Sequence, residues 1–118
     1  FVPLNVTWPM MLTVPELESL RPQHPRAEFF QQLMLAHARH FAPEPVFRFH
    51  DPTVILALET PAEFLSVALT IGCAAGNDFA RLMQSSTGHP ASLMRAPPQQ
   101  APALLAELLA RLGLDQPA

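Results

Sequence analysis

Proline is the residue that most restricts how this chain can fold, because it occurs 14 times in 118 residues. Its ring fixes φ and removes a backbone donor, so proline ends helices beyond their first turn and is excluded from central strands. Pro3 and Pro9 bracket the segment Leu4 to Trp8, in which apolar and polar residues alternate. The alternation predicts a short strand, and the two prolines place it at a sheet edge.

Two helices are expected before residue 45. Thr13 and Glu16 have the spacing of a capping box, so a short helix is predicted from about Pro15 to Leu20. The segment from Arg26 to Phe41 predicts a longer helix, because apolar residues recur along it at helical spacing and form one stripe. The members of this stripe are Phe30, Leu33, Met34, His37 and Phe41.

The middle of the chain predicts a hairpin followed by a helix. Val46 to Phe49 and Val54 to Leu58 have strand composition, and the residues between them, 50–53, include the turn formers Asp and Pro. Thr60 then stands as an N-cap before Pro61 at the first helical position, with Glu63 at the third. A helix is therefore expected to begin at residue 60.

Small residues recur every fourth position in this expected helix. They are Ala68, Gly72, Gly76 and Ala80. Two interpretations remain open: the small side chains allow close packing of another backbone, or the helix breaks near Gly76 and Asn77 caps a second helix from Asp78 to about Gln84.

The C-terminal part predicts an amphipathic helix behind a Pro-rich segment. Residues 85–102 contain four prolines together with Ser, Thr, Gly and Gln, which is typical of a linker or an irregular loop. Glu107 and Arg111 are spaced for an ion pair on one helix face, and Gly113 is placed to end that helix. The apolar stripe of the helix consists of Leu105, Leu108, Leu109 and Leu112.

The predicted fold is α+β, with three to four helices packed on a small antiparallel hairpin. Residues 1–84 are expected to form a compact α+β core. Residues 85–102 are expected to be the Pro-rich linker or irregular loop, and residues 103–114 the C-terminal amphipathic helix of the same domain.

Charged residues make up only 14% of the chain, against about 25% in a typical protein. A surface with so little charge is better tolerated when another chain covers part of it. All seven basic residues are arginines scattered singly, and the formal net charge is −3, so no footprint for nucleic acid exists. The absence of lysine beside abundant Ala, Leu and Pro indicates a GC-rich bacterial source.

Cys73 is the single cysteine, which excludes an internal disulfide and indicates a reducing compartment, the cytoplasm. Its neighbours are apolar or small, so a buried, unreactive thiol is expected. The uncharged stretch from Phe64 to Asn77 is shorter than the ~20 residues needed to span a bilayer, so no membrane span is expected.

The histidines offer one concrete chemical alternative. His37 and His40 are three apart on an expected helix, and His50 could add a third ligand to a metal ion. A hydrogen-bonded core role for His37 and a surface role for His40 are favoured over this, because the spacing alone is not specific. No Gly-x-Ser-x-Gly motif, Gly-rich phosphate loop or carboxylate pair accompanies them, so an enzyme is not favoured and no cofactor is expected.

These observations favour a non-enzymatic interaction subunit or assembly factor of a bacterial complex, with a protein partner or further copies of the chain as its binding partner. The binding residues expected are those of the terminal stripe, Leu105, Leu108, Leu109 and Leu112. The alternatives are a small metal-binding protein that uses the three histidines, or a small-molecule-binding domain with its pocket under the hairpin.

Overall fold

Short helices and short antiparallel strands alternate in the computed structural model, which describes residues 1–73 and 82–118. The helices are α1 (Leu4–Thr7), α2 (Val14–Ser19), α3 (Pro25–His40), α4 (His50–Glu59), α5 (Ala101–Arg111) and the 3₁₀ helices η1 (Pro61–Glu63) and η3 (Pro98–Gln100). The strands are β1 (Met11–Thr13), β2 (Arg21–Pro22), β3 (Val46–Arg48), β4 (Leu65–Cys73), β5 (Leu82–Gln84), β6 (His89–Arg95) and β7 (Leu114–Asp115). The predicted α+β class is confirmed, with five α-helices in the described part instead of three or four.

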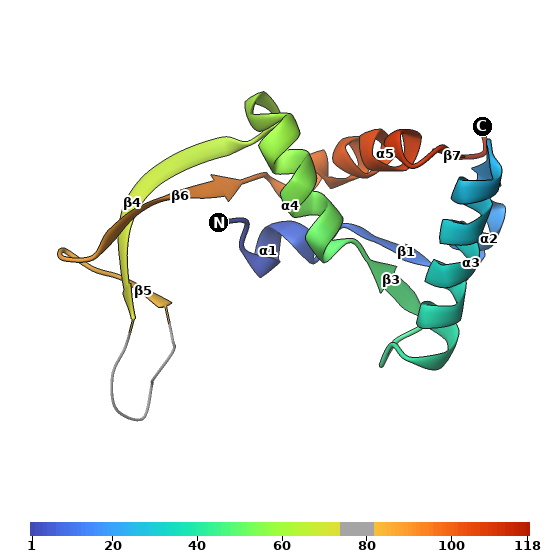
Figure 1. Cartoon of the computed structure of the whole chain (residues 1–118), viewed down its shortest axis with the longest axis horizontal. Helices are drawn as coiled ribbons and strands as arrows, with labels where there is room; N and C mark the ends of the chain where they lie inside the picture. The colour runs from blue at the N-terminus through green and yellow to red at the C-terminus, as the bar shows by residue number, and fades with distance from the viewer. Residues whose placement is uncertain (74–81) are drawn as a thin grey trace.

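The molecule consists of a helical body and a long β-arm (Figure 1). Strands β4 and β6 pair antiparallel along their length, from Leu65 opposite Arg95 to Ile71 opposite His89, and β5 pairs with the far end of β4. The radius of gyration is 16.8 Å, whereas a compact domain of this length has about 13.5 Å. The arm therefore accounts for an elongated shape of 49 × 33 × 24 Å.

Two short sheets join segments of the body that are distant in sequence. Strand β1 pairs with β3, and β2 pairs with β7, both antiparallel. The buried core lies between α4, α5 and the α2–α3 pair, and its most enclosed apolar side chains come from every part of the body. They are Met10, Leu17, Phe49, Leu56, Leu109 and Leu114.

The first residue connects the body to the arm. The Phe1 ammonium donates to the Ser92 carbonyl at 2.7 Å, and the Met94 amide donates to the Phe1 carbonyl at 2.7 Å. Phe1 thus pairs with the edge of β6 that β4 leaves open. This contact fixes the base of the arm beside α1.

The predicted cap of the short helix is confirmed. Thr13 accepts from the Glu16 amide, and Glu16 accepts from the Thr13 amide at 2.8 Å and the Thr13 hydroxyl at 2.7 Å. Both orphan donors at the start of α2 are therefore satisfied.

Helix α3 has the predicted extent, but its predicted stripe does not all face the core. Ala27, Gln31, Met34, Leu35 and Ala38 are the buried residues of the helix. Of the predicted stripe only Met34 is buried, whereas Phe30, Leu33 and Phe41 are exposed. The helix has apolar side chains on two faces, so the apolar pattern alone could not identify the inward one.

The N-terminal strand prediction is wrong, because residues 4–7 form α1. Leu4 and Trp8 are four apart, a spacing that lies on one face of a helix and on one face of a strand alike. The Trp8 amide donates to the Leu4 carbonyl at 2.7 Å, which is the helical bond.

The predicted hairpin at residues 46–58 is half wrong. Strand β3 exists, but Val54 to Leu58 lie within α4. Asp51 and Pro52 stand in the first turn of α4, where the amides lack helical partners and a negative charge is favourable. Asp51 and Pro52, which suggest a turn in the sequence, therefore begin a helix in the structure.

The helix predicted at Thr60 is also wrong. Thr60 does not cap a helix; its hydroxyl donates to the Leu56 carbonyl at 2.7 Å, at the end of α4. One 3₁₀ turn follows, and Leu65 to Cys73 then form β4. Gly72 lies in this strand, Gly76 and Asn77 lie outside the described residues, and residues 82–84 of the predicted second helix form β5.

The Pro-rich segment holds regular structure. Strand β6 occupies residues 89–95 and η3 occupies 98–100, where a linker or irregular loop is predicted. The terminal helix α5 follows as predicted, with its Glu107–Arg111 ion pair at 2.8 Å and Gly113 at φ +73° beyond its end.

Glu16→Gln is expected to lower stability only where the carboxylate is ionised. The Glu16 carboxylate accepts hydrogen bonds from the backbone amide and the hydroxyl of Thr13. These two bonds, and the amide bond most strongly, hold the pKa of Glu16 below its ordinary value. Because the pKa of Glu16 is lower in the folded than in the unfolded chain, its carboxylate stabilises the fold fully at any pH above the unfolded-state pKa. This stabilisation is lost as the pH falls through the folded-state pKa. Urea unfolding should show a constant difference from the unmodified protein above about pH 5.5, shrinking below about pH 4.5. Glu63→Gln is the control, and an equal difference at every pH contradicts the assignment.

Gly113→Ala is expected to cost more stability than Gly72→Ala. At φ +73° an added Cβ is strained, and it would lie 2.3 Å from the His24 imidazole, which accepts the Ala27 amide at the start of α3. At Gly72 the nearest atom lies at 3.3 Å, on the Ser85 side chain. Chemical denaturation should show a loss of about 1 kcal/mol or more for Gly113→Ala. Equal losses for both variants would contradict the turn geometry.

Candidate functional site

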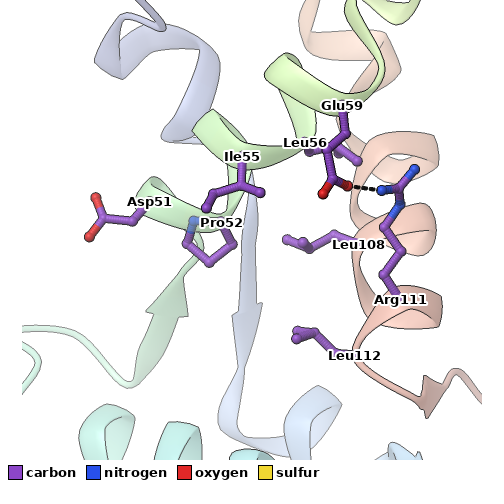
Figure 2. A pocket seen from close by; sticks show the side chains of 8 residues that line it. All are labelled: Asp51, Pro52, Ile55, Leu56, Glu59, Leu108, Arg111 and Leu112. Atoms are coloured by element: carbon purple, nitrogen blue, oxygen red, sulfur yellow. Dashed lines mark hydrogen bonds and ion pairs between the residues drawn. The ribbon is translucent and has the colours of Figure 1, made fainter.

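An apolar groove of about 380 Å³ lies between α4 and α5 (Figure 2). Ile55 and Pro52 form one wall, and Leu108 and Leu112 point towards them from the other. Leu56, 1% exposed, lies at its base, and the lining is almost entirely carbon. The groove follows from two helices whose facing side chains do not fully interlock.

The four predicted binding residues divide between the core and this groove. Leu105, Leu108 and Leu109 are 7%, 6% and 0% exposed, so their side chains pack on the chain's own body. Leu112 is half-buried. Only Leu108 and Leu112 reach the groove, and the structure does not bring Leu105 and Leu109 to it.

Charged groups lie at the rim of the groove. Arg111 is ion-paired with Glu59 of α4 and with Glu107 one turn earlier in α5. The hydrogen bond with Glu107 is the main reason that the pKa of Arg111 is raised, so the guanidinium stays charged. Asp51 lies at the opposite end and points away from the ion pair.

An exposed apolar ridge on α4 borders the groove. Ile55 is 58% exposed, Val54 39% and Leu58 78%. On the far side of the ridge, Val54 and Leu58 line a second hollow of about 500 Å³, towards Phe1 and the arm. Helix α4 therefore shows apolar side chains both to the core and to solvent.

Sequence reasoning missed Ile55 and Pro52 because it assigned residues 54–58 to a strand. The signal that identifies them is present: Pro52, Ile55, Leu56 and Glu59 are spaced at i, i+3, i+4 and i+7. That spacing places all four on one helix face, which is the face of the groove.

The three predicted histidine ligands, His37, His40 and His50, do not form a group that could hold a metal ion. The His37 ring lies 5.5 Å from the Phe47 ring and 6.3 Å from the Phe41 ring. His50 shares a 2.7 Å hydrogen bond with the Thr7 hydroxyl. Among residues 1–73 and 82–118, no three His, Cys, Asp or Glu side chains form a group that could hold a metal ion.

Cys73 is exposed at the end of β4, not buried in a helix as predicted. Across the part of the chain that the structure describes, no helix is long and apolar enough to cross a membrane.

Comparison with known protein families gives no match, and no curated protein matches the chain. The geometry of its surfaces is therefore the basis for proposing its function.

Leu109→Ala is expected to destabilise the protein by about 3 kcal/mol, because a fully enclosed leucine loses its contacts and leaves a cavity. Leu112→Ala, at the half-buried edge of the groove, should cost less than half as much. Urea denaturation monitored by circular dichroism measures both. Equal small losses would show that α5 is not part of the core.

Proposed function

We propose that the chain is a non-enzymatic interaction subunit of a bacterial complex, and that the α4–α5 groove binds an amphipathic helix of a partner protein. The observation that carries the proposal is the groove with its exposed ridge residue Ile55. A helix can present apolar residues at i, i+3, i+4 and i+7 to such a groove.

The hydrophobic gain determines how much of the groove a partner helix must cover. Ile55 is 58% exposed and Leu112 is half-buried, so covering either side chain would contribute at most about 2 kcal/mol to the free energy of binding. Several such contacts are needed to offset the cost of association. The proposed partner helix therefore fills the groove along its length, from the Asp51 end to Arg111.

The charge at the rim of the groove favours a basic partner helix. The rim has three carboxylates and one cation, so its formal net charge is −2; the carboxylates belong to Asp51, Glu59 and Glu107, and the cation is Arg111. A helix with lysine or arginine beside its apolar stripe would meet opposite charge, which favours encounter and the correct orientation.

The alternatives have less support. A small-molecule site needs a few polar groups that converge inside an apolar pocket, whereas the polar groups of this groove lie at its rim. The metal alternative lacks a third ligand among the described residues. The absence of lysine beside abundant Ala, Leu and Pro supports the bacterial source within the proposal, and the single cysteine supports the cytoplasm.

A designed peptide of about four helical turns tests the proposal. Its apolar face carries leucines at the spacing above, and its flanks carry lysine in one version and glutamate in the other. Fluorescence anisotropy should show the lysine version binding at least about tenfold more tightly than the glutamate version.

Ile55→Asp should weaken binding of the lysine peptide at least about tenfold, because the new carboxylate would be buried by the peptide. Leu58→Asp is the matched control: it places the same charge on α4, on a side chain that does not line this groove. Both residues are exposed, so circular dichroism should stay unchanged. Absence of binding by either peptide, or equal loss in both variants, would refute the proposal.

A further inference from the structure

The outer edge of β4 is open where the arm leaves the body (Figure 1). Strand β4 pairs with β6 on one side, from Leu65 to Ile71, whereas β5 borders its other side only from Ile71 to Cys73. No other strand of the described chain lies on that second side, so residues 65–69 have one edge without a strand beside it. The base of the arm is therefore a two-stranded ribbon, and two strands alone are only marginally stable in water.

The register shows which backbone groups face this open edge. The Ser85 amide donates to the Thr70 carbonyl at 2.9 Å, so the backbone groups of Thr70 point towards the β5 side. Successive residues of a strand direct their backbone groups to opposite edges. Ala68 and Ser66 alternate with Thr70 in this pattern, so their N–H and C=O groups also point to the open edge. An extended chain is the ligand whose own N–H and C=O groups match such a row.

The opposite edge of the arm is closed. On the outer side of β6, Phe1 bonds to the Ser92 carbonyl and to the Met94 amide. Pro90, further along the same strand, has no amide hydrogen to offer. Strand β4 lacks this protection, since residues 65–73 contain no proline and no charged residue. The fold thus protects one edge of the ribbon and leaves the other free to pair.

We propose that the open edge of β4 binds an extended segment of a partner protein as an added strand. The space is about five residues long, because β5 begins to pair at Ile71 and η1 ends at Glu63. Leu65 and Val67, 63% and 37% exposed, lie on one face of the arm, so partner residues opposite them gain apolar contacts. The segment that fits therefore alternates apolar residues with polar or small ones.

Charge at the base of β4 favours a basic residue at one end of this segment. The exposed Glu63 lines a hollow of about 340 Å³ together with Glu107 of α5. Glu107 is ion-paired with Arg111, whereas no ion pair within the described residues includes Glu63. A segment that runs antiparallel to β4 has its C-terminal end at Glu63. A lysine or arginine at that end would meet opposite charge.

A second copy of the chain fits this edge less well than a short segment. In a symmetric antiparallel pair of β4 strands that matches Ser66 of one copy with Ala68 of the other, Ile71 lies opposite Glu63. Strand β5 borders the same edge from Ile71 onwards, so it would be directed at η1 of the other copy. A segment that has no β5 of its own meets no such obstacle.

A labelled peptide with valine at alternate positions tests the added strand. Its core is Val-Thr-Val-Thr-Val followed by lysine, and fluorescence anisotropy should show that it binds. N-methylation of both threonines removes the amides that face β4, so it should weaken binding at least about tenfold. N-methylation of two valines is the matched control, because those amides point away from β4. Absence of binding, or equal loss in both methylated peptides, would overturn the proposal.

Proline substitutions locate the site on the protein. Ala68→Pro removes an amide from the open edge and should weaken peptide binding at least about tenfold while circular dichroism is unchanged. Ser92→Pro is the matched control, because Ser92 pairs with Ala68 and its amide faces the opposite edge. Ile55→Asp should not affect this peptide, so the groove and the edge are tested separately.

The methylated peptides decide the matter in the unmodified protein, whatever a proline does to the arm. Equal loss in the two proline variants would contradict a site on β4. Sedimentation velocity tests the other occupant: a dimer that Ala68→Pro dissociates would assign the edge to a second copy and would overturn the proposal.

Discussion

The packing of α5 is the interaction on which the rest of the body depends. Its fully buried Leu109 and the following Leu114, 1% exposed, lie in the central core, and β7 pairs with β2 immediately before α3. Helix α5 also packs against α4, whose groove it completes. One C-terminal segment therefore connects α4 and the base of the arm to the α2–α3 pair. Leu109 and Leu114 thus fix α5 and β7 to the body, and the groove forms because α5 is held beside α4 in this way.

The body is too small to bury all the apolar side chains that its helices carry. Both α3 and α4 bury one face and present a second apolar face to solvent, with Phe29 on α3 and Leu58 on α4 as the clearest cases. A surface with little charge follows directly, since positions that usually hold ionised groups hold Phe, Leu, Ile and Val here. The low charge of the sequence and the exposed ridges of the structure are the same property, and both favour contact with other chains.

How much of this the sequence could predict depends on whether a local signal had more than one meaning. The capping box at Thr13, the extent of α3 and the end of α5 at Gly113 were predicted correctly. The capping-box spacing is not sufficient by itself, because Thr60 and Glu63 have the same spacing and only one 3₁₀ turn forms there. The spacing of four residues has two outcomes, since positions i and i+4 share a face in a helix and in a strand alike. The small residues around Gly72 were assigned to a helix because the Thr60 start signal precedes them and their spacing of four fits a helix, although Leu65, Val67, Leu69 and Ile71 alternate with them at the strand period.

The candidate site was predictable only in part, for a different physical reason. A leucine stripe shows that a helix buries one side, but it does not show against what, and the burial of Leu105 and Leu109 was decided by the approach of elements far away in sequence.

The groove limits how tightly a single partner helix can be held. Leu56 and Leu108 are only 1% and 6% exposed, so the chain already covers them, whereas Ile55 is 58% exposed and Leu112 is half-buried. Only surface that a partner newly covers adds to the free energy of association. Most of the gain in this groove must therefore come from the exposed ridge of α4, beside which the groove lies.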